Sequence, residues 1–192
     1  MRKCLEHNSL IKEKLSSLSL FQCTLFFSLT CERQLPVYAK FSLGKPWSNF
    51  KALRLLLDEC WDWSISHGKG QKPFIPTADN FIEITSGQAG AGHALYPYYS
   101  IEDLVKCIAN QVVDPKANPA NNAITIIDSY LYDTEFESVT KKNDALVDEH
   151  PLMVNEIRYQ IANINAVSNK NWVAVDWQKE KNKVIGKSIL NL

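Results

Sequence analysis

The sequence predicts a mainly α fold: a compact, single-domain bundle of several helices, with a short strand or an extended tail at its C-terminal end. Three observations lead to this prediction. The chain has 192 residues, which suits one domain with a sizeable core. Apolar residues make up 45% and charged residues 22%, as in a globular rather than a disordered protein. Apolar positions recur mostly at steps of three and four residues, the spacing of amphipathic helices.

The N-terminal half contains two helical patterns. Over residues 8–34 the spacing predicts one amphipathic helix, or two, which we expect to end at Pro36. Residues 37–41 then form a short connector. Ser48 is placed to cap a second helix that runs to about Ile65. The inner face of that helix consists of apolar residues at helical spacing: Phe50, Leu53, Leu56, Leu57, Cys60 and Trp61.

The middle of the chain is less regular. Residues 81–85 alternate weakly between apolar and polar, like a strand, and Ser100 suits the start of a helix. Asn121 or Asn122 can cap a further helix that continues towards Phe136. The β-branched residues of that segment also fit a strand, so both structures remain open for it.

The C-terminal part begins with a long helical pattern over residues 144–168, interrupted at Pro151. From Trp172 onward, apolar and polar residues alternate, so a short strand and a docked extended segment both fit. No internal repeat appears along the chain. We therefore expect one helical domain over residues 1–192.

Composition argues against several functional classes. Lys and Arg number 21 together, and so do Asp and Glu, so no overall positive field would recruit nucleic acid or an acidic membrane. The apolar run at 18–29 is too short to span a bilayer and lacks a signal-peptide cleavage site. The five cysteines are widely spaced without a CxxC pair, which favours reduced thiols. We therefore expect a cytoplasmic protein with no membrane or nucleic-acid partner.

No catalytic or cofactor motif is complete. Residues 87–92 have the glycine frame of a phosphate-binding loop, but His93 and Ala94 replace the lysine and the hydroxyl residue that bind phosphate and magnesium. The four histidines lie far apart, and no G-x-S-x-G elbow is present. We therefore predict no enzymatic activity, no cofactor and no metal. Whether the glycine loop binds any ligand stays open.

Aromatic residues are more informative, because those that the core does not need could form a binding surface. Trp63 lies two residues from Trp61, so the two cannot face the same side of a helix. An exposed tryptophan or tyrosine cluster beside acidic residues would suit a protein partner. The candidate partner-binding residues are two acidic and four aromatic side chains: Asp58, Asp62, Trp63, Tyr96, Tyr98 and Tyr99.

Three stretches of the chain resemble a known family. Residues 31–42 read C-E-R-x-L-P-x-Y-x-x-F-S, residues 53–63 read L-R-x-x-L-D-x-x-W-x-W, and residues 149–160 read E-H-P-L-M-x-x-E-x-x-x-Q. In this order, over roughly residues 20–167, they resemble the YjaG-like bacterial family of unknown function. The resemblance implies a compact, all-helical cytoplasmic protein and brings no established activity, cofactor or site residues. The middle segment and the tail, about 168–192, depart from the family pattern, which suggests a diverged and specialised member.

Two functional hypotheses follow. One is a non-enzymatic bacterial protein-binding protein, most concretely an immunity protein that neutralises a toxin domain by direct binding. The alternative is a cryptic enzyme or small-ligand binder, with Glu32, Arg33, Asp58 and His93 in a pocket between helices. Clustering of those four side chains in a desolvated site would favour the alternative. If Glu32 and Arg33 only join helices together while the aromatic residues lie on an acidic surface, protein binding is favoured.

Overall fold

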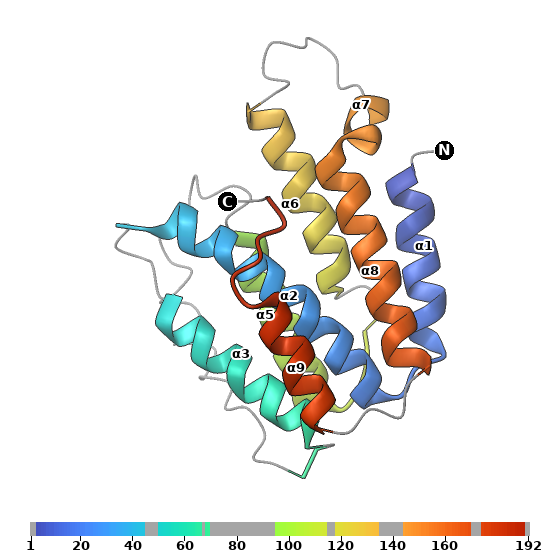
Figure 1. The fold of residues 1–192 in the computed structure, drawn as a ribbon, viewed down its shortest axis with the longest axis vertical. Coiled ribbons are helices and arrows are strands. Elements are labelled where there is room, and N and C mark those ends of the chain that lie inside the picture. Colours follow the sequence, from blue (N-terminus) through green and yellow to red (C-terminus); the bar gives the residue numbers. More distant parts are fainter. Residues whose placement is uncertain are drawn as a thin grey trace.

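The computed structural model describes residues 3–44, 50–66, 68–69, 95–114, 118–134, 144–169 and 174–190, and within them every regular element is a helix (Figure 1). The prediction of a mainly α fold is confirmed. The expected strand at 81–85, the glycine loop at 87–92 and His93 lie outside the described residues. The helices are α1 Lys3–Ser16, α2 Leu20–Ser42, α3 Phe50–Ile65, α5 Tyr96–Asn110, α6 Pro119–Thr134, α7 Asp144–Glu149, α8 Pro151–Asn169 and α9 Ala174–Val184.

The first helical pattern forms two helices, because a cap at Ser19 starts α2 anew. The Ser19 hydroxyl accepts a hydrogen bond from the Gln22 amide at 3.4 Å, and the Gln22 side chain accepts one from the Ser19 amide at 2.9 Å. This reciprocal capping box satisfies amides that a helix start leaves free. The expected helix end at Pro36 is wrong, since α2 runs through this residue. Residues 37–41 are helical because the packing of α2 outweighs one lost backbone hydrogen bond.

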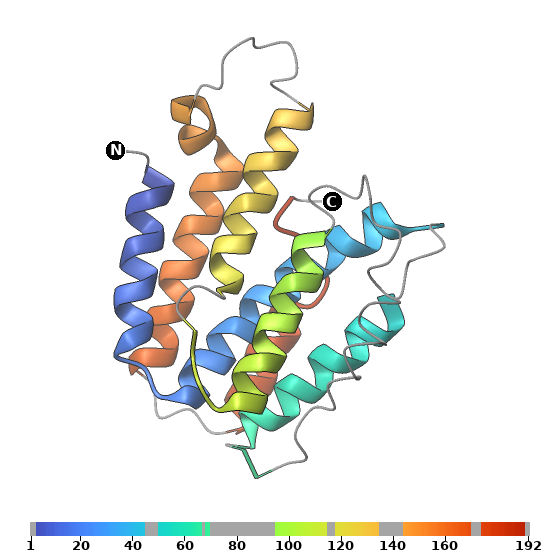
Figure 2. The same cartoon turned by 180° about the vertical axis from the view of Figure 1, so that it is seen from behind.

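Helix α2 is the centre of the fold. It contacts α3, α5 and α9 as well as α6 and α8, while α1 packs on α6 and α8. Figure 1 shows α9 in front of α2, and Figure 2 shows α5 on the opposite face. A helix with neighbours around most of its circumference must be apolar around it too. Accordingly, α2 buries large side chains in consecutive positions, including Leu25, Phe26 and Phe27.

Two clusters of buried apolar side chains meet at α2. One includes Trp61, Tyr98 and Trp177 among residues of α2, α3, α5 and α9, and α1, α6 and α8 also contribute to it. The other involves α6, α7 and α8 and includes Met153, with Val37 contributed by α2. Because α1, α2, α6 and α8 each supply residues to both clusters, the helices form one body.

Helices α5 and α6 begin earlier than the sequence predicts. α5 starts at Tyr96, with a proline in its first turn, rather than at Ser100. Proline is tolerated there because the first amides of a helix have no intrahelical partner. α6 starts at Pro119 and is capped by Asn118, whose side chain accepts a hydrogen bond from the Ala120 amide at 3.0 Å. The alternative that this segment forms a strand is wrong.

The C-terminal part agrees with the sequence at one point and differs at another. The interruption at Pro151 is confirmed, because it separates α7 from α8. The tail differs, since residues 174–184 form helix α9 rather than a strand or an extended segment. Trp177, Lys181 and Val184 are all buried, and their steps of four and three residues place them on one face of that helix.

The chain after α9 returns to the centre of the fold. The Ile189 amide donates a hydrogen bond to the Arg33 carbonyl of α2 at 3.1 Å. Ile189 and Leu190 are buried in the second apolar cluster. This segment therefore contributes to the core.

Candidate functional site

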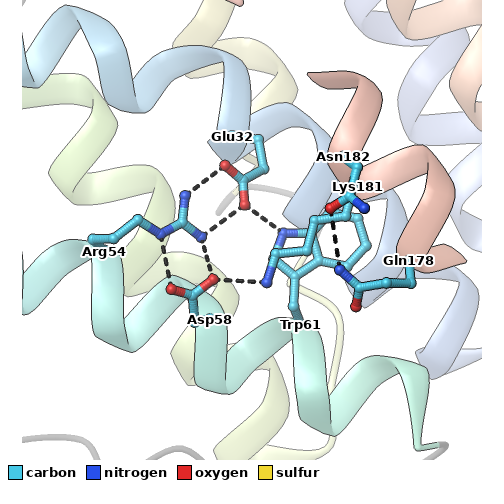
Figure 3. Close-up of polar contacts among 7 residues, drawn as sticks. All are labelled: Glu32, Arg54, Asp58, Trp61, Gln178, Lys181 and Asn182. Carbon is cyan, nitrogen blue, oxygen red and sulfur yellow. Dashed lines mark hydrogen bonds and ion pairs between the residues drawn. The ribbon is translucent and has the colours of Figure 1, made fainter. Parts of the chain in front are cut away.

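Glu32 is a carboxylate in the middle of α2 with only 1% of its surface exposed. Its two oxygens accept hydrogen bonds from Arg54 of α3 at 2.6 and 2.7 Å (Figure 3). The indole N–H of Trp61, also on α3, donates to one of them at 2.8 Å. A buried carboxylate needs polar partners in place of water, and the bidentate arginine and the indole supply them. These contacts join α2 to α3.

Asp58 extends this network to the C-terminal helix. Arg54 donates to Asp58 at 3.0 and 2.8 Å across one turn of α3. Lys181 of α9 donates to Asp58 at 2.7 Å, and its ammonium lies 5.8 Å from the centre of the Trp61 ring. Figure 3 shows the side chains converging from α2, α3 and α9. We call Glu32, Arg54, Asp58, Trp61 and Lys181 the charge clamp.

The charge clamp favours the ionised forms of Asp58 and Arg54. Burial alone would raise the pKa of Asp58, but the hydrogen bonds from Lys181 and Arg54 outweigh it and hold that pKa below its ordinary value. Burial also disfavours the charged form of Arg54, yet the hydrogen bonds and charges of Glu32 and Asp58 raise its pKa above the ordinary one. Proton transfer needs a group whose pKa lies near the working pH. This arrangement instead favours a rigid junction between helices.

Arg33 follows Glu32 in the sequence but contacts the other group of helices. Its Nε and Nη2 donate to Glu156 of α8 at 3.1 and 2.7 Å. Gln160 donates from its amide nitrogen to Glu156 at 3.0 Å, so its oxygen faces His7 of α1, whose Nε2 lies 2.7 Å away. His7 therefore donates this hydrogen bond. The second network joins α2, α8 and α1.

The four residues of the alternative hypothesis do not come together in the described part of the chain. Glu32 and Asp58 share Arg54, Arg33 belongs to the second network, and His93 lies outside the described residues. Glu32 and Arg33 each join α2 to another helix. Among the described residues, no group of three or more His, Cys, Asp and Glu could hold a metal ion.

The predicted aromatic partner-binding residues differ widely in exposure. Trp63 and Tyr98 are each only 2% exposed, and the Trp63 ring packs 5.4 Å from that of Phe21. A partner cannot reach either ring in this structure, which differs from the expectation of an exposed tryptophan. Tyr96 is partly buried, whereas Tyr99 is 40% exposed. Tyr99 is therefore the accessible member of the aromatic set.

The predicted acidic residues Asp58 and Asp62 lie on and beside the exposed side of α3. Leu55, Glu59 and Asp62 are exposed at steps of four and three residues, and Leu55 is 56% exposed. We call these three residues the α3 outer face. Asp58 borders it with 39% of its side chain exposed, while Asp62 forms no ion pair with any residue that the structure describes. Leu55 was not among the residues selected from the sequence. Its position is not part of the helical spacing that defines the inner face, and this was a signal that Leu55 is exposed.

The five cysteines are all buried, and none forms a disulfide bond. Burial raises the pKa of Cys23, with a smaller contribution from the neighbouring Cys107, to about 12. Burial likewise raises the pKa of Cys107 to about 12. Both are therefore thiols rather than reactive thiolates at neutral pH.

Comparison with known proteins identifies the family. The family described as "Protein of unknown function (DUF416)" matches residues 10–191. The chain belongs to the DUF416 family. The expected kinship with an uncharacterised helical family is confirmed at this level. No curated protein matches the chain.

A solved structure of another DUF416 family protein, from Shewanella baltica OS155, is similar to this chain with a TM-score of 0.72. The similarity covers 91% of this chain and 92% of that one, at 18% sequence identity. At this identity, the likeness shows a shared fold alone. The DUF416 match spans α2, α3 and α9, and thus every helix that contributes to the charge clamp. No helix in the described part of this DUF416 chain is long and apolar enough to cross a membrane.

Proposed function

We propose that this DUF416 member is a non-enzymatic protein-binding protein, most concretely an immunity protein that neutralises a toxin domain by direct binding. The observation that carries the proposal is the α3 outer face, where Leu55 is exposed beside Glu59 and Asp62. Such a composition suits a small binding surface: burial of the apolar side chain supplies affinity, and the surrounding charges guide encounter and select the partner.

The support beneath this face also suits binding. The opposite side of α3 buries Leu53, Leu57 and Trp61, and Arg54 holds the helix to Glu32 of α2. A helix fixed in this way presents its outer side chains in one arrangement. A preorganised surface loses less conformational entropy when a partner binds.

The acidic character of the face indicates the chemistry of its partner. Carboxylates at Glu59 and Asp62 would pair with lysine and arginine side chains around a shallow apolar site. A toxin domain that acts on nucleic acid carries such a basic surface, because it must bind phosphates. Occupation of that surface by the α3 outer face would exclude the substrate and neutralise the toxin.

Two finer assignments accompany the proposal. We place the protein in the cytoplasm, because its five cysteines form no disulfide bond and cytoplasmic thiols are kept reduced. We also assign the chain to a YjaG-like group within the DUF416 family, on the resemblance carried by residues 31–42, 53–63 and 149–160.

The test uses the full chain as bait in a lysate of its own organism, followed by identification of the captured protein and measurement with the purified pair. We expect a basic domain whose toxic activity is inhibited at equal stoichiometry. The double substitution Leu55→Ala with Asp62→Lys should weaken binding at least about tenfold, since it removes the apolar contact and reverses a charge.

The matched control is Leu5→Ala with Glu6→Lys on α1, where an exposed leucine also stands beside an exposed carboxylate. This control should retain the partner. Capture that is equally insensitive to both double substitutions would place binding elsewhere. Absence of any stoichiometric protein partner would contradict the proposal as a whole.

A further inference from the structure

A cavity of about 440 Å³ lies at the C-terminal end of α5. The last two turns of α5 line it with Asp103, Lys106, Cys107 and Asn110, and residues 112–114 form another part of its wall. Gln111 makes this shape, because its left-handed backbone, with φ of 55°, ends the helix and redirects the chain. The volume lies in the range of small-molecule sites. None of the charge clamp or the α3 outer face contributes to it.

The charged residues of this cavity leave Asp103 poorly compensated. Lys106 is directed to Glu102, with 2.6 Å between its ammonium and that carboxylate. Asp103 accepts a long hydrogen bond from the side-chain amide of Asn122 on α6, at 3.5 Å. Burial and then the charge of Glu102 raise the pKa of Asp103 to about 6, against the weaker opposing effects of Lys106 and Asn122. A cation beside Asp103 would relieve this unfavourable state.

Two other features of the cavity point to the same ligand class. The carbonyl groups of the last turn of α5 give the helix end a partial negative charge, which attracts cations. The rest of the wall includes apolar groups: the valines at 112–113 and the buried Cys107, which is a neutral thiol. A ligand with a positive head and a short apolar body matches both parts of the wall.

We propose that the cavity at the C-terminal end of α5 binds a small organic cation, a primary amine with a short apolar chain, through an ion pair between the ammonium and Asp103. This site is independent of the proposed protein-binding surface. It would give the protein a small-molecule ligand in addition to its partner.

The test compares three probes with the same apolar chain and different heads: pentylamine, 1-pentanol and pentanoate. The amide NMR signals of residues 103–114 report on the cavity. We expect saturable shifts with pentylamine, at least tenfold weaker binding of 1-pentanol, and none of pentanoate. Equal binding of pentylamine and 1-pentanol would show an apolar site without the ion pair and overturn the proposal, as would the absence of saturable shifts with pentylamine.

Substitution identifies the anchor. Asp103→Asn keeps the size of the side chain and should weaken pentylamine binding at least tenfold. Glu13→Gln, on the exposed side of α1, also removes one negative charge and should leave binding within twofold. Unchanged affinity in the Asp103 variant would overturn the proposal. Amide spectra of both variants establish that each remains folded.

The pH dependence provides a separate readout. Because the pKa of Asp103 is about 6, pentylamine should bind roughly tenfold more weakly at pH 5 than at pH 7.5, where the carboxylate is ionised. The other charged groups near Asp103 are Glu102, Lys106 and Asp114, and the neighbouring Cys31 thiol of α2 is kept protonated by burial. The Asp103→Asn variant should lose most of this pH dependence, and its retention would contradict the assignment.

Discussion

The acidic residues of this protein differ in their contribution to stability, because some are buried and others are exposed. Glu32 is buried and accepts hydrogen bonds from Arg54 and Trp61. Asp62, one turn after Asp58 on α3, is exposed. Removal of one partner from a buried ion pair leaves the other charge without compensation. An exposed charge stays solvated whether or not it has a partner. Stability should therefore depend on Glu32 and hardly on Asp62.

The substitution Glu32→Ala should lower the free energy of unfolding by about 3 kcal/mol, the lower end of the range for broken buried pairs, because Arg54 would keep Asp58 as a partner. The control Asp62→Ala should change it by no more than about 0.5 kcal/mol. Urea unfolding followed by circular dichroism measures both. A loss below about 1 kcal/mol for Glu32→Ala, as for a surface pair, would show that the charge clamp is not a stabilising junction.

Only part of the charge clamp could be predicted from the sequence. Arg54 and Asp58 are four residues apart on a predicted helix, a spacing that brings side chains together. Lys181 is 123 positions from Asp58, and no local spacing encodes that contact. The burial of Trp63 could not be predicted from the sequence either, because it depends on contact with Phe21 of another helix.

At the scale of elements, the sequence predicts helices reliably where apolar spacing is long and fails where a local signal competes with packing. Pro36 is a helix breaker in isolation, but α2 is enclosed by neighbours and continues through it. The tail was ambiguous because its apolar residues alternate up to Trp177. From Trp177 onward, Lys181 and Val184 continue a helical face, and one member of that face is a lysine, which hydrophobic patterning does not count.

The buried Lys181 should fasten α9 to the rest of the protein. Lys181→Ala removes its hydrogen bond to Asp58 and its contact with the Trp61 ring. We expect hydrogen–deuterium exchange of residues 174–190 to become about tenfold faster, because local opening becomes easier by about 1.4 kcal/mol. Exchange in α1 should not change, since α1 packs mainly on α6 and α8 and contributes no residue to the charge clamp.

The matched control for α9 is Lys183→Ala, whose side chain is 63% exposed and pairs with Glu180 within the same helix. It should leave exchange in α9 almost unchanged, as should breaking the hydrogen bond between Gln178 and Asn182 that Figure 3 shows beside the clamp. Equal acceleration in the two lysine variants would show that the buried contacts of Lys181 do not hold α9 in place.

At the scale of the whole molecule, α2 connects two groups of helices through adjacent residues. Glu32 accepts a hydrogen bond from Arg54 of α3, and Asp58 extends this network to α9. Arg33 donates a hydrogen bond to Glu156 of α8. Each of the two apolar clusters also includes residues of α2. One group should therefore be unable to unfold while the other remains, because either event would remove packing and buried hydrogen bonds that hold α2 in place. This is a prediction of a single cooperative transition.

The substitution Glu156→Gln tests that cooperativity. Glu156 is fully buried on α8, and its loss should destabilise the protein by about 3 kcal/mol by leaving Arg33 without its charge partner.

Trp61, Trp63 and Trp177 lie on α3 and α9, in the other group of helices. In one cooperative unit, tryptophan fluorescence and far-ultraviolet circular dichroism should give the same urea midpoint, lowered equally by the substitution. If the α3–α9 side unfolded by itself, the fluorescence midpoint would stay at its wild-type value while the circular dichroism midpoint fell, and α2 would then be a boundary between two units.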